Sequence, residues 1–184
     1  GFDSLVECFE EETPQIFAIE TGLSSDSAMN WLVSALDKIT LVSNSDAHSL
    51  PNIGREANIF ETDSISYQEI YQIIKNKDQK KFIATIEFYP EEGMYHFDGH
   101  RLCGTSFSPE ETKKQKGICP VCKKPLTIGV MNRVTELADR PEGFKPKNAI
   151  DYYKLIELDK IIAEVLNIKS RASRAVKTEY DNLI

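Results

Sequence analysis

Ile-Thr-Leu-Val-Ser-Asn-Ser-Asp-Ala-His, residues 39–48, is the part of the sequence from which the fold is most readily predicted. Its first half is a short apolar run, which is typical of a buried strand. Asp46 and His48 follow directly. Because side chains two positions apart in an extended chain point to the same side, this pair should lie together at the carboxyl end of the strand. A metal-binding pair is one interpretation of this pattern, and a capped turn is the other.

The residues before this stretch complete a strand–helix–strand unit. Residues 16–20 form another apolar run, and the Ser- and Asp-rich residues 24–27 offer N-caps for a helix. The apolar face expected for this helix consists of Met29, Leu32, Val33 and Leu36. Strand, helix and strand with short connections predict a parallel sheet or an α/β barrel.

Glu20 ends the first of these strands, much as Asp46 follows the second. Because the carboxyl ends of parallel strands meet at one edge, Glu20 is expected on the same rim as Asp46 and His48. There it is a candidate third metal ligand or catalytic base. The alternative for Glu20 is a salt bridge on the rim to Arg55.

Farther along the chain, the sequence predicts a helix and a strand, and then a linker and further helices. Ser66 and Glu69 form a capping-box pattern for a helix that buries isoleucines, and residues 81–88 return as a strand. A linker-like Pro-Glu-Glu-Gly follows at residues 90–93, and helices are expected near 128–139, 150–167 and 170–183. The expected domains are therefore an α/β part over 1–89, a metal-binding segment over 90–127 and a helical region over 128–184.

Four potential zinc ligands dominate the middle segment. They form two close pairs, His100 with Cys103 and Cys119 with Cys122, and two residues separate the members of each pair. This spacing lets each tight turn direct both side chains at one ion, so the pattern predicts a small zinc ribbon. A filled tetrahedron leaves no open coordination position, which makes this zinc structural. The alternative is a disulfide with a surface histidine.

Two neighbouring features are less certain from spacing alone. His96 could replace His100 as the fourth ligand if the local chain were helical, but Gly99 and the aromatic residues before it favour a short strand and hence His100. Cys8 lies far from the other cysteines in sequence, and we expect it to be a buried free thiol.

Composition is that of a water-soluble folded protein. The chain has 184 residues, of which 41% are hydrophobic and 28% charged, so it can bury a core as one or two domains. It has no apolar run of membrane-spanning length and no leader-like start, which predicts a cytoplasmic protein without a membrane partner.

The formal net charge of −7 argues against affinity for nucleic acid over the whole surface. The first 63 residues are strongly acidic, however, whereas the rest has a slight excess of basic residues. Basic residues near the zinc ligands and in the last expected helix could contact phosphates, although solvated surface charge is an equally good interpretation of each one alone. They are Lys113, Lys114, Lys116, Lys123, Lys124, Lys169, Arg171, Arg174 and Lys177.

Several stretches, in this order, resemble one known family. Ser-Asp-Ala-His after an apolar strand is similar to the last metal-binding motif of the polymerase-and-histidinol-phosphatase (PHP) phosphoesterase superfamily. The wider set resembles the endonuclease Q family of DNA-repair nucleases over nearly the whole chain. It comprises residues 19–26, 29–31, 43–49, 54–58, 95–101, 119–122 and 136–141.

The resemblance implies a fold and an activity. The fold would be part of a PHP-type α/β barrel, followed by the zinc ribbon and an α-helical C-terminal region. The activity would be hydrolysis of DNA phosphodiesters 5′ of a deaminated base, such as hypoxanthine or uracil, or of an abasic site. Asp46 and His48 would bind a catalytic divalent metal, zinc, manganese or magnesium, with Glu20 beside them. Arg55 is the candidate contact to the substrate phosphate, with a helix-cap or ion-pair role as the alternative.

One departure from the superfamily pattern limits this expectation. The superfamily site also needs an early His-x-His pair and a further histidine, yet His48 is the only histidine in the first 95 residues. We therefore expect residues 1–89 to be the C-terminal part of a barrel, and the 184-residue piece to be inactive by itself. An exposed half-barrel edge would favour pairing with a second copy as a homo-oligomer.

Two other functions fit the same residues. A zinc-ribbon module that binds nucleic acid or a protein would leave the acidic first part purely structural. A PHP phosphatase acting on small phosphorylated substrates is the other possibility. The appended zinc segment disfavours the phosphatase, because a small substrate gives no reason for an added surface of that size.

Overall fold

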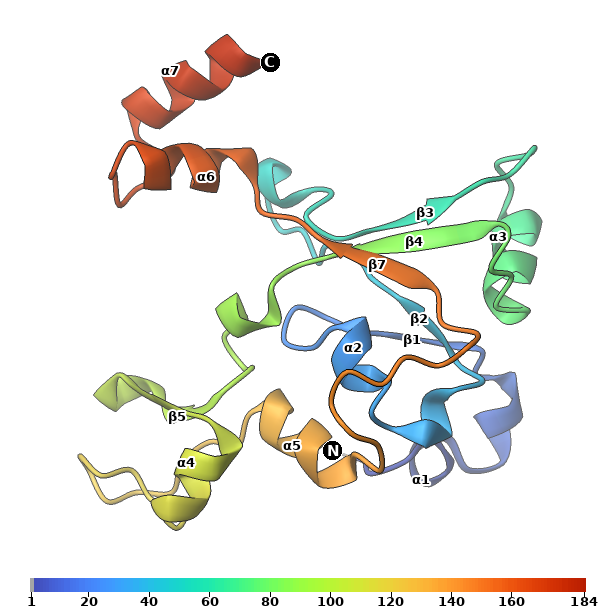
Figure 1. Ribbon diagram of the computed structural model, residues 1–184, viewed down its shortest axis with the longest axis horizontal. Coiled ribbons are helices and arrows are strands. Elements are labelled where there is room, and N and C mark those ends of the chain that lie inside the picture. Colours follow the sequence, from blue (N-terminus) through green and yellow to red (C-terminus); the bar gives the residue numbers. More distant parts are fainter. Residues whose placement is uncertain (1) are drawn as a thin grey trace.

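The computed structural model describes residues 2–184, and the strand pair expected around Asp46 is present (Figure 1). Strands β1 (Ala18–Glu20) and β2 (Thr40–Val42) are parallel, with Ala18 opposite Thr40 and Glu20 opposite Val42. Both strands lie within the apolar runs that predicted them. The prediction of a parallel strand pair is therefore confirmed, and Glu20 lies at the same edge as the end of β2.

A second sheet has three strands in the order β3-β4-β7. Strand β4 (Phe82–Glu87) pairs antiparallel with β3 (Ala57–Phe60) and parallel with β7 (Asp151–Lys154). The third sheet is a hairpin of β5 (Asp98–His100) and β6 (Thr105–Phe107). The α/β class is confirmed, but the strands described between residues 2 and 184 form three small sheets and no closed barrel.

Strand β7 corrects the expectation of a helix over 150–167. Residues 151–154 form β7 and pair with β4, and helix α6 starts only at Leu158. The aromatic residues explain the difference, because Tyr152 packs edge-on against Trp31 with ring centroids 5.5 Å apart, and large aromatics suit a half-buried strand. The region 128–184 is therefore not wholly α-helical: one of its segments returns to the sheet that precedes the ribbon.

The helix expected after residue 27 is also interrupted. Helix α2 (Ser27–Asn30) ends after one turn, and a 3₁₀ turn, η2 (Ser34–Leu36), follows it. Backbone groups that a longer helix would use are bound elsewhere. The backbone N–H of Asp139 donates to Leu32 O at 3.0 Å, and the Asp139 carboxylate accepts from Ser34 N–H at 2.9 Å. Tertiary hydrogen bonds have thus overridden the local helical pattern.

Figure 1 shows the remaining helices along the chain. Helix α3 begins where the capping pattern predicts, because the Ser66 hydroxyl accepts the N–H of Glu69 at 3.2 Å. The helices are α1 (Leu5–Phe9), α3 (Tyr67–Lys75), α4 (Pro109–Lys114), α5 (Val130–Leu137), α6 (Leu158–Val165) and α7 (Arg174–Leu183). The 3₁₀ turns are η1 (Glu10–Gln15), η3 (Leu50–Asn52), η4 (Pro90–Glu92) and η5 (Arg101–Cys103).

The buried apolar residues form three small clusters. The first contains Trp31, Leu41 and Ala149; the second Ile73, Phe82 and Ile150; and the third Ile162, Ala163 and Val176. Because Ala149 and Ile150 are neighbours in sequence, the segment leading into β7 joins the first two clusters. The third lies within the α6–α7 hairpin, which projects away from the sheets in Figure 1.

No helix in the part of the chain that the structure describes combines the length and the apolar character of a membrane span. Cys8, expected to be buried, is half-buried and makes no disulfide.

Phe82 offers a test of the second cluster. Its side chain is 1% exposed, whereas that of its neighbour Ile83 is 38% exposed. We expect Phe82→Ala to lower the free energy of unfolding by about 3–5 kcal/mol, through lost burial and the cavity left behind. Ile83→Ala, the matched control in the same strand, should cost less than about 1 kcal/mol. Urea unfolding followed by circular dichroism measures both, and equal losses would contradict this placement of the core.

Candidate functional site

The loop after β2 brings Asp46 and His48 together. Asp46 has a positive φ of 43°, and this bend directs its carbonyl oxygen at His48 Nδ1, 2.9 Å away. The nearer Asp46 carboxylate oxygen lies 3.7 Å from the same nitrogen, and both side chains are largely exposed. The predicted pair is therefore formed at the carboxyl end of the strand, with its polar atoms open to a ligand.

Glu20 lies at the end of the neighbouring strand, and its side chain is exposed. Within residues 2–184, the only cluster of three or more His, Cys, Asp or Glu ligand atoms close enough to hold a metal is formed by His100, Cys103, Cys119 and Cys122. The structure therefore does not bring Glu20 into a three-ligand cluster with Asp46 and His48. The salt bridge to Arg55, the alternative for Glu20, is also not formed in this described range.

Residues 54–58 hold the Asp46 loop from the other side. Arg55 Nε donates to Ser45 O at 2.8 Å, and Arg55 Nη2 lies 3.5 Å from Asp46 O. The Asn58 side chain accepts from Ser43 N–H at 3.0 Å and donates to Ser43 O at 2.8 Å, so it binds this residue as a neighbouring strand would. Arg55 thus contacts the backbone of the loop that carries Asp46 and His48.

Glu56, next to Arg55, and Glu87, at the end of β4, carry buried carboxyl groups that sequence patterns had not indicated. Glu87 Oε2 accepts from Ser27 N–H at 2.9 Å, and Oε1 accepts from the hydroxyls of Ser27 and Thr85 at 2.6 and 2.7 Å. Burial raises the pKa of the Glu87 carboxyl, against these hydrogen bonds. An acidic residue at the end of the largely apolar strand 82–87 was the available signal for such a buried group.

Glu56 is the less satisfied member of this pair. Its Oε1 accepts from Phe88 N–H at 3.2 Å, whereas Oε2 is buried and has no hydrogen-bond partner in the described chain. Burial is the main cause that raises the pKa of the Glu56 carboxyl to about 7; the nearby Glu87 acts in the same direction, and the hydrogen bond from Phe88 acts against both. The folded protein therefore favours the protonated form of Glu56 at pH values below about 7.

This raised pKa predicts a fall in stability with pH. Between the usual pKa of 4.5 and about 7, the unfolded chain has lost the Glu56 proton while the folded chain keeps it. The free energy of unfolding should therefore fall across this window and level off above it, by roughly 3 kcal/mol for this group. Glu56→Gln removes the effect, because an amide does not ionise.

Denaturant unfolding of both proteins from pH 4 to 8 measures this difference. We expect Glu56→Gln to gain stability relative to the wild type as pH rises, because every other titrating group, including Glu87, remains in both proteins. Parallel stability curves for the two proteins would show that Glu56 does not hold its proton in the folded state.

The zinc segment assembles the four predicted ligands. Atoms of His100, Cys103, Cys119 and Cys122 all lie within 4.8 Å of one another. His100 ends β5, Cys103 ends η5, and Gly104 follows in the left-handed conformation that turns the chain into β6. None of the four cysteines in the described chain forms a disulfide. A donor set of three sulfurs and one nitrogen suits a tetrahedral structural zinc.

Backbone geometry in the second turn favours thiolate at Cys119. This residue is buried, and the backbone N–H groups of Cys122 and Val121 lower the pKa of its thiol to about 6 against the effect of burial. Cys122 Sγ lies 3.4 Å from His100 Nδ1. His96, the alternative ligand, is buried away from the cluster with Nδ1 3.0 Å from Ser24 O. The cluster therefore contains His100 and not His96.

Metal content tests this cluster directly. We expect elemental analysis of the purified chain to find about one tightly held zinc, because a closed four-ligand site binds strongly. Cys119→Ser should lose this zinc and unfold at a lower temperature. Cys8→Ser, a half-buried cysteine outside the cluster, is the matched control and should keep it. A metal-free wild type, or zinc retained by Cys119→Ser, contradicts the assignment.

Comparison with known proteins extends over the whole chain. No protein-family model matches it. An uncharacterized protein of Methanocaldococcus jannaschii is 34% identical over 191 residues, and the uncharacterized protein YqxK of Bacillus subtilis is 37% identical over 145. These alignments cover 100% and 78% of this chain, but only 23% and 36% of the relatives. The chain thus spans about a quarter to a third of these curated relatives.

Two solved structures are similar in both fold and sequence. One is the lesion-specific endonuclease PfuEndoQ from Pyrococcus furiosus, with a TM-score of 0.83. The other is endonuclease Q in complex with a 27-mer duplex carrying an abasic lesion at the active site, with a TM-score of 0.85. Each is 33% identical, and each match covers 99% of this chain and 45% of the solved chain.

Proposed function

Because this chain belongs to the endonuclease Q family, we propose that it carries one part of the active site of a metal-dependent DNA-repair endonuclease. The observation that supports this most strongly is similarity over 99% of the chain to an endonuclease Q bound to duplex DNA with an abasic lesion. The proposed reaction of the complete protein is hydrolysis of the phosphodiester 5′ of an abasic site or a deaminated base. The chain spans 45% of the solved relatives, so the activity is assigned to the complete protein.

Asp46 and His48 are the proposed ligands of the catalytic metal. His48 Nδ1 faces the Asp46 carbonyl oxygen at 2.9 Å, an arrangement that suits a protonated Nδ1 and leaves the Nε2 lone pair for a metal. The Asp46 carboxylate is exposed beside it. A divalent metal held there would acidify a bound water and stabilise negative charge on the phosphate.

We propose that the first role of Arg55 is to hold the loop that carries Asp46 and His48 in place. Two of its five N–H groups are directed at the backbone oxygens of Ser45 and Asp46, which fixes the direction of both metal ligands. The remaining N–H groups are available for the predicted contact to a substrate phosphate. Arg55 would then link substrate position to ligand position.

Glu20 is proposed as a third ligand or base only in the complete site. In this chain it stands alone at the end of β1, and His48 is the only histidine before residue 96. We therefore propose that the 184-residue chain does not incise DNA without the remaining ligands. We also propose three segments, 1–89, 90–127 and 128–184, with β7 of the last returning to pair with β4.

Incision of a labelled duplex with one abasic site tests this function. In the complete protein with manganese, Asp46→Asn should lower incision at least about 100-fold, and Arg55→Ala about 10- to 100-fold, because Arg55 supports the ligands from outside the coordination shell. Raised metal concentration should partly restore Arg55→Ala but not Asp46→Asn. Glu12→Gln, an exposed acid in η1, is the control.

If Asp46→Asn incised DNA as fast as the wild type, Asp46 would not be a ligand of the catalytic metal. If Arg55→Ala showed the same metal dependence as the wild type, Arg55 would not position the metal ligands. Clean incision by the 184-residue chain alone would overturn the proposal that it lacks a complete site.

A further inference from the structure

Within residues 2–184, no cluster of buried apolar side chains joins the α6–α7 hairpin to the sheets. The third cluster consists of hairpin residues alone, and the hairpin stands apart from the sheets in Figure 1. Leu155 and Ile156, which connect β7 to the hairpin, are 54% and 45% exposed. A cavity of about 640 Å³ lies between the hairpin and the loop that contains Ser49 and Pro51. The position of the hairpin must therefore depend on other contacts.

Arg171, between α6 and α7, connects the hairpin to the Asp46 loop. Its Nη2 donates to Asn52 Oδ1 at 3.1 Å. Asn52 ends η3, and its carbonyl oxygen accepts the backbone N–H of Arg55 at 3.3 Å. The Arg55 side chain in turn donates to Ser45 O. A chain of hydrogen bonds therefore runs from the hairpin to the Asp46 loop.

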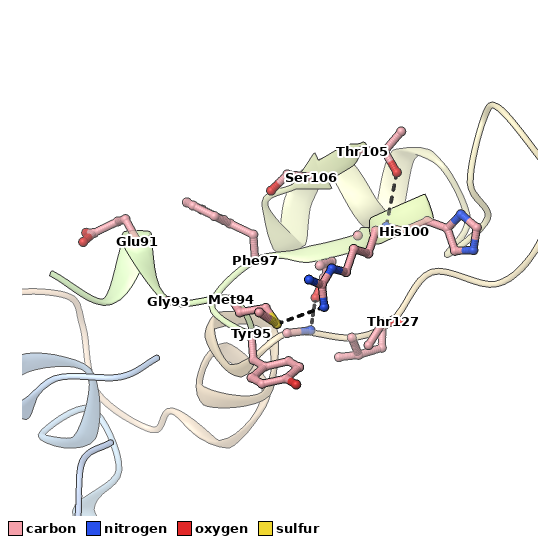
Figure 2. A pocket seen from close by; sticks show the side chains of 14 residues that line it. Glu91, Gly93, Met94, Tyr95, Phe97, His100, Thr105, Ser106 and Thr127 are labelled. Atoms are coloured by element: carbon pink, nitrogen blue, oxygen red, sulfur yellow. Dashed lines mark hydrogen bonds between the residues drawn. The ribbon is translucent and has the colours of Figure 1, made fainter. Parts of the chain in front are cut away.

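Lys160, on α6, makes a second connection. Its Nζ lies 2.7 Å from Glu92 Oε2 and 4.7 Å from the centroid of the buried Phe88 ring. The Arg55 guanidinium lies 5.8 Å from the same centroid, so one ring contacts a cation of the hairpin and the cation that holds the Asp46 loop. Glu92 ends η4, from which the chain runs to His100 in Figure 2. Lys160 thus connects the hairpin to the zinc segment as well.

Glu157, directly before α6, holds both of these cations. Its Oε1 lies 3.4 Å from Arg171 Nη1, and its Oε2 lies 2.9 Å from Lys160 Nζ. The Glu157 side chain is 17% exposed, so salt and water screen these ion pairs less than they screen pairs on the open surface. Asp159 lies 3.8 Å from Arg171 but does not reach Lys160. Within residues 2–184, Glu157 is thus the one carboxylate that pairs with both cations.

We propose that Glu157 is a positioning residue for the Asp46 loop. It acts through Arg171 and Lys160, and these act through Arg55, which holds the backbone of the loop. The hairpin is then mechanically linked to the metal site, although none of its residues forms a hydrogen bond or ion pair with Asp46 in the described chain. The alternative is that these ion pairs stabilise only the hairpin, as many surface pairs do. The link to catalysis rests on the proposed function, whereas the contacts themselves do not.

Amide signals in the NMR spectrum of the ¹⁵N-labelled, zinc-loaded chain test the connection without any reaction. We expect Glu157→Gln to shift the signals of residues 45–48 and of Arg55, because Arg171 and Lys160 lose the charge that they share. Glu164→Gln, an exposed acid on α6 without an ion pair within residues 2–184, is the matched control and should leave these signals in place. Shifts confined to the hairpin would overturn the inference.

The manganese concentration for half-maximal incision by the complete protein measures the effect on the metal site. Glu157→Gln should raise it about 2- to 30-fold and leave the rate at saturating manganese nearly unchanged, because the ligands themselves remain. In an Arg55→Ala background the same change should have little further effect, since Glu157 acts through Arg55. An equal further rise in that background would overturn the inference. If the complete protein did not incise DNA, the shifted amide signals would still support the connection, so the two failures are separately visible.

Discussion

The hydrogen bonds between Asn58 and Ser43 connect the two sheets on which the proposed site depends. Ser43 ends the β1–β2 pair, and the Asn58 amide binds both its backbone N–H and its carbonyl from strand β3. The Ser43 hydroxyl donates to Ile86 O at 3.0 Å, so the same residue also reaches β4. Two separate sheets are thereby fixed at the point where the Asp46 loop begins, and Arg55 then fixes the loop itself. The direction of Asp46 and His48 follows from contacts made beneath them.

Burying the carboxyl groups of Glu87 and Glu56 costs free energy. Glu87 accepts three hydrogen bonds and ties the start of α2 to β4, which offsets part of the free energy lost by burying a carboxyl group. Asp26, next to Ser27, forms an ion pair of 2.6 Å with Lys154 of β7. Polar contacts therefore join α2, β4 and β7 where the apolar clusters are small. Glu56 lacks such compensation at one oxygen, and it lies next to Arg55, directly before strand β3.

Local patterns in the sequence predicted the features whose parts are close together in the chain. The four metal ligands come from two tight turns, and Asp46 and His48 come from one loop, so spacing alone could place them. The contacts of Asn58, Glu56 and Glu87 join strands that are distant in sequence, and no local pattern indicates such partners. Strand β7 was mistaken for helix because its strand conformation depends on pairing with β4. Helix α2 is short because Asp139, far along the chain, binds Ser34.

The proposed function assigns different work to two metal centres. The cluster of three cysteines and His100 would hold the β5–β6 segment together, since its soft ligands and closed geometry suit zinc. The Asp46–His48 pair presents an exposed oxygen and nitrogen ligand, which suits a harder, exchangeable divalent ion. These preferences allow manganese to report on the second site while zinc remains in the first.

Paramagnetic broadening by manganese in the ¹⁵N-labelled, zinc-loaded chain would show whether the Asp46 loop is a metal half-site. Added Mn²⁺ should broaden the amide signals of residues 44–49 first, and Asp46→Asn should abolish that broadening while the signals of the zinc segment stay sharp. Broadening confined to other acidic surfaces, or unchanged in Asp46→Asn, would contradict the account.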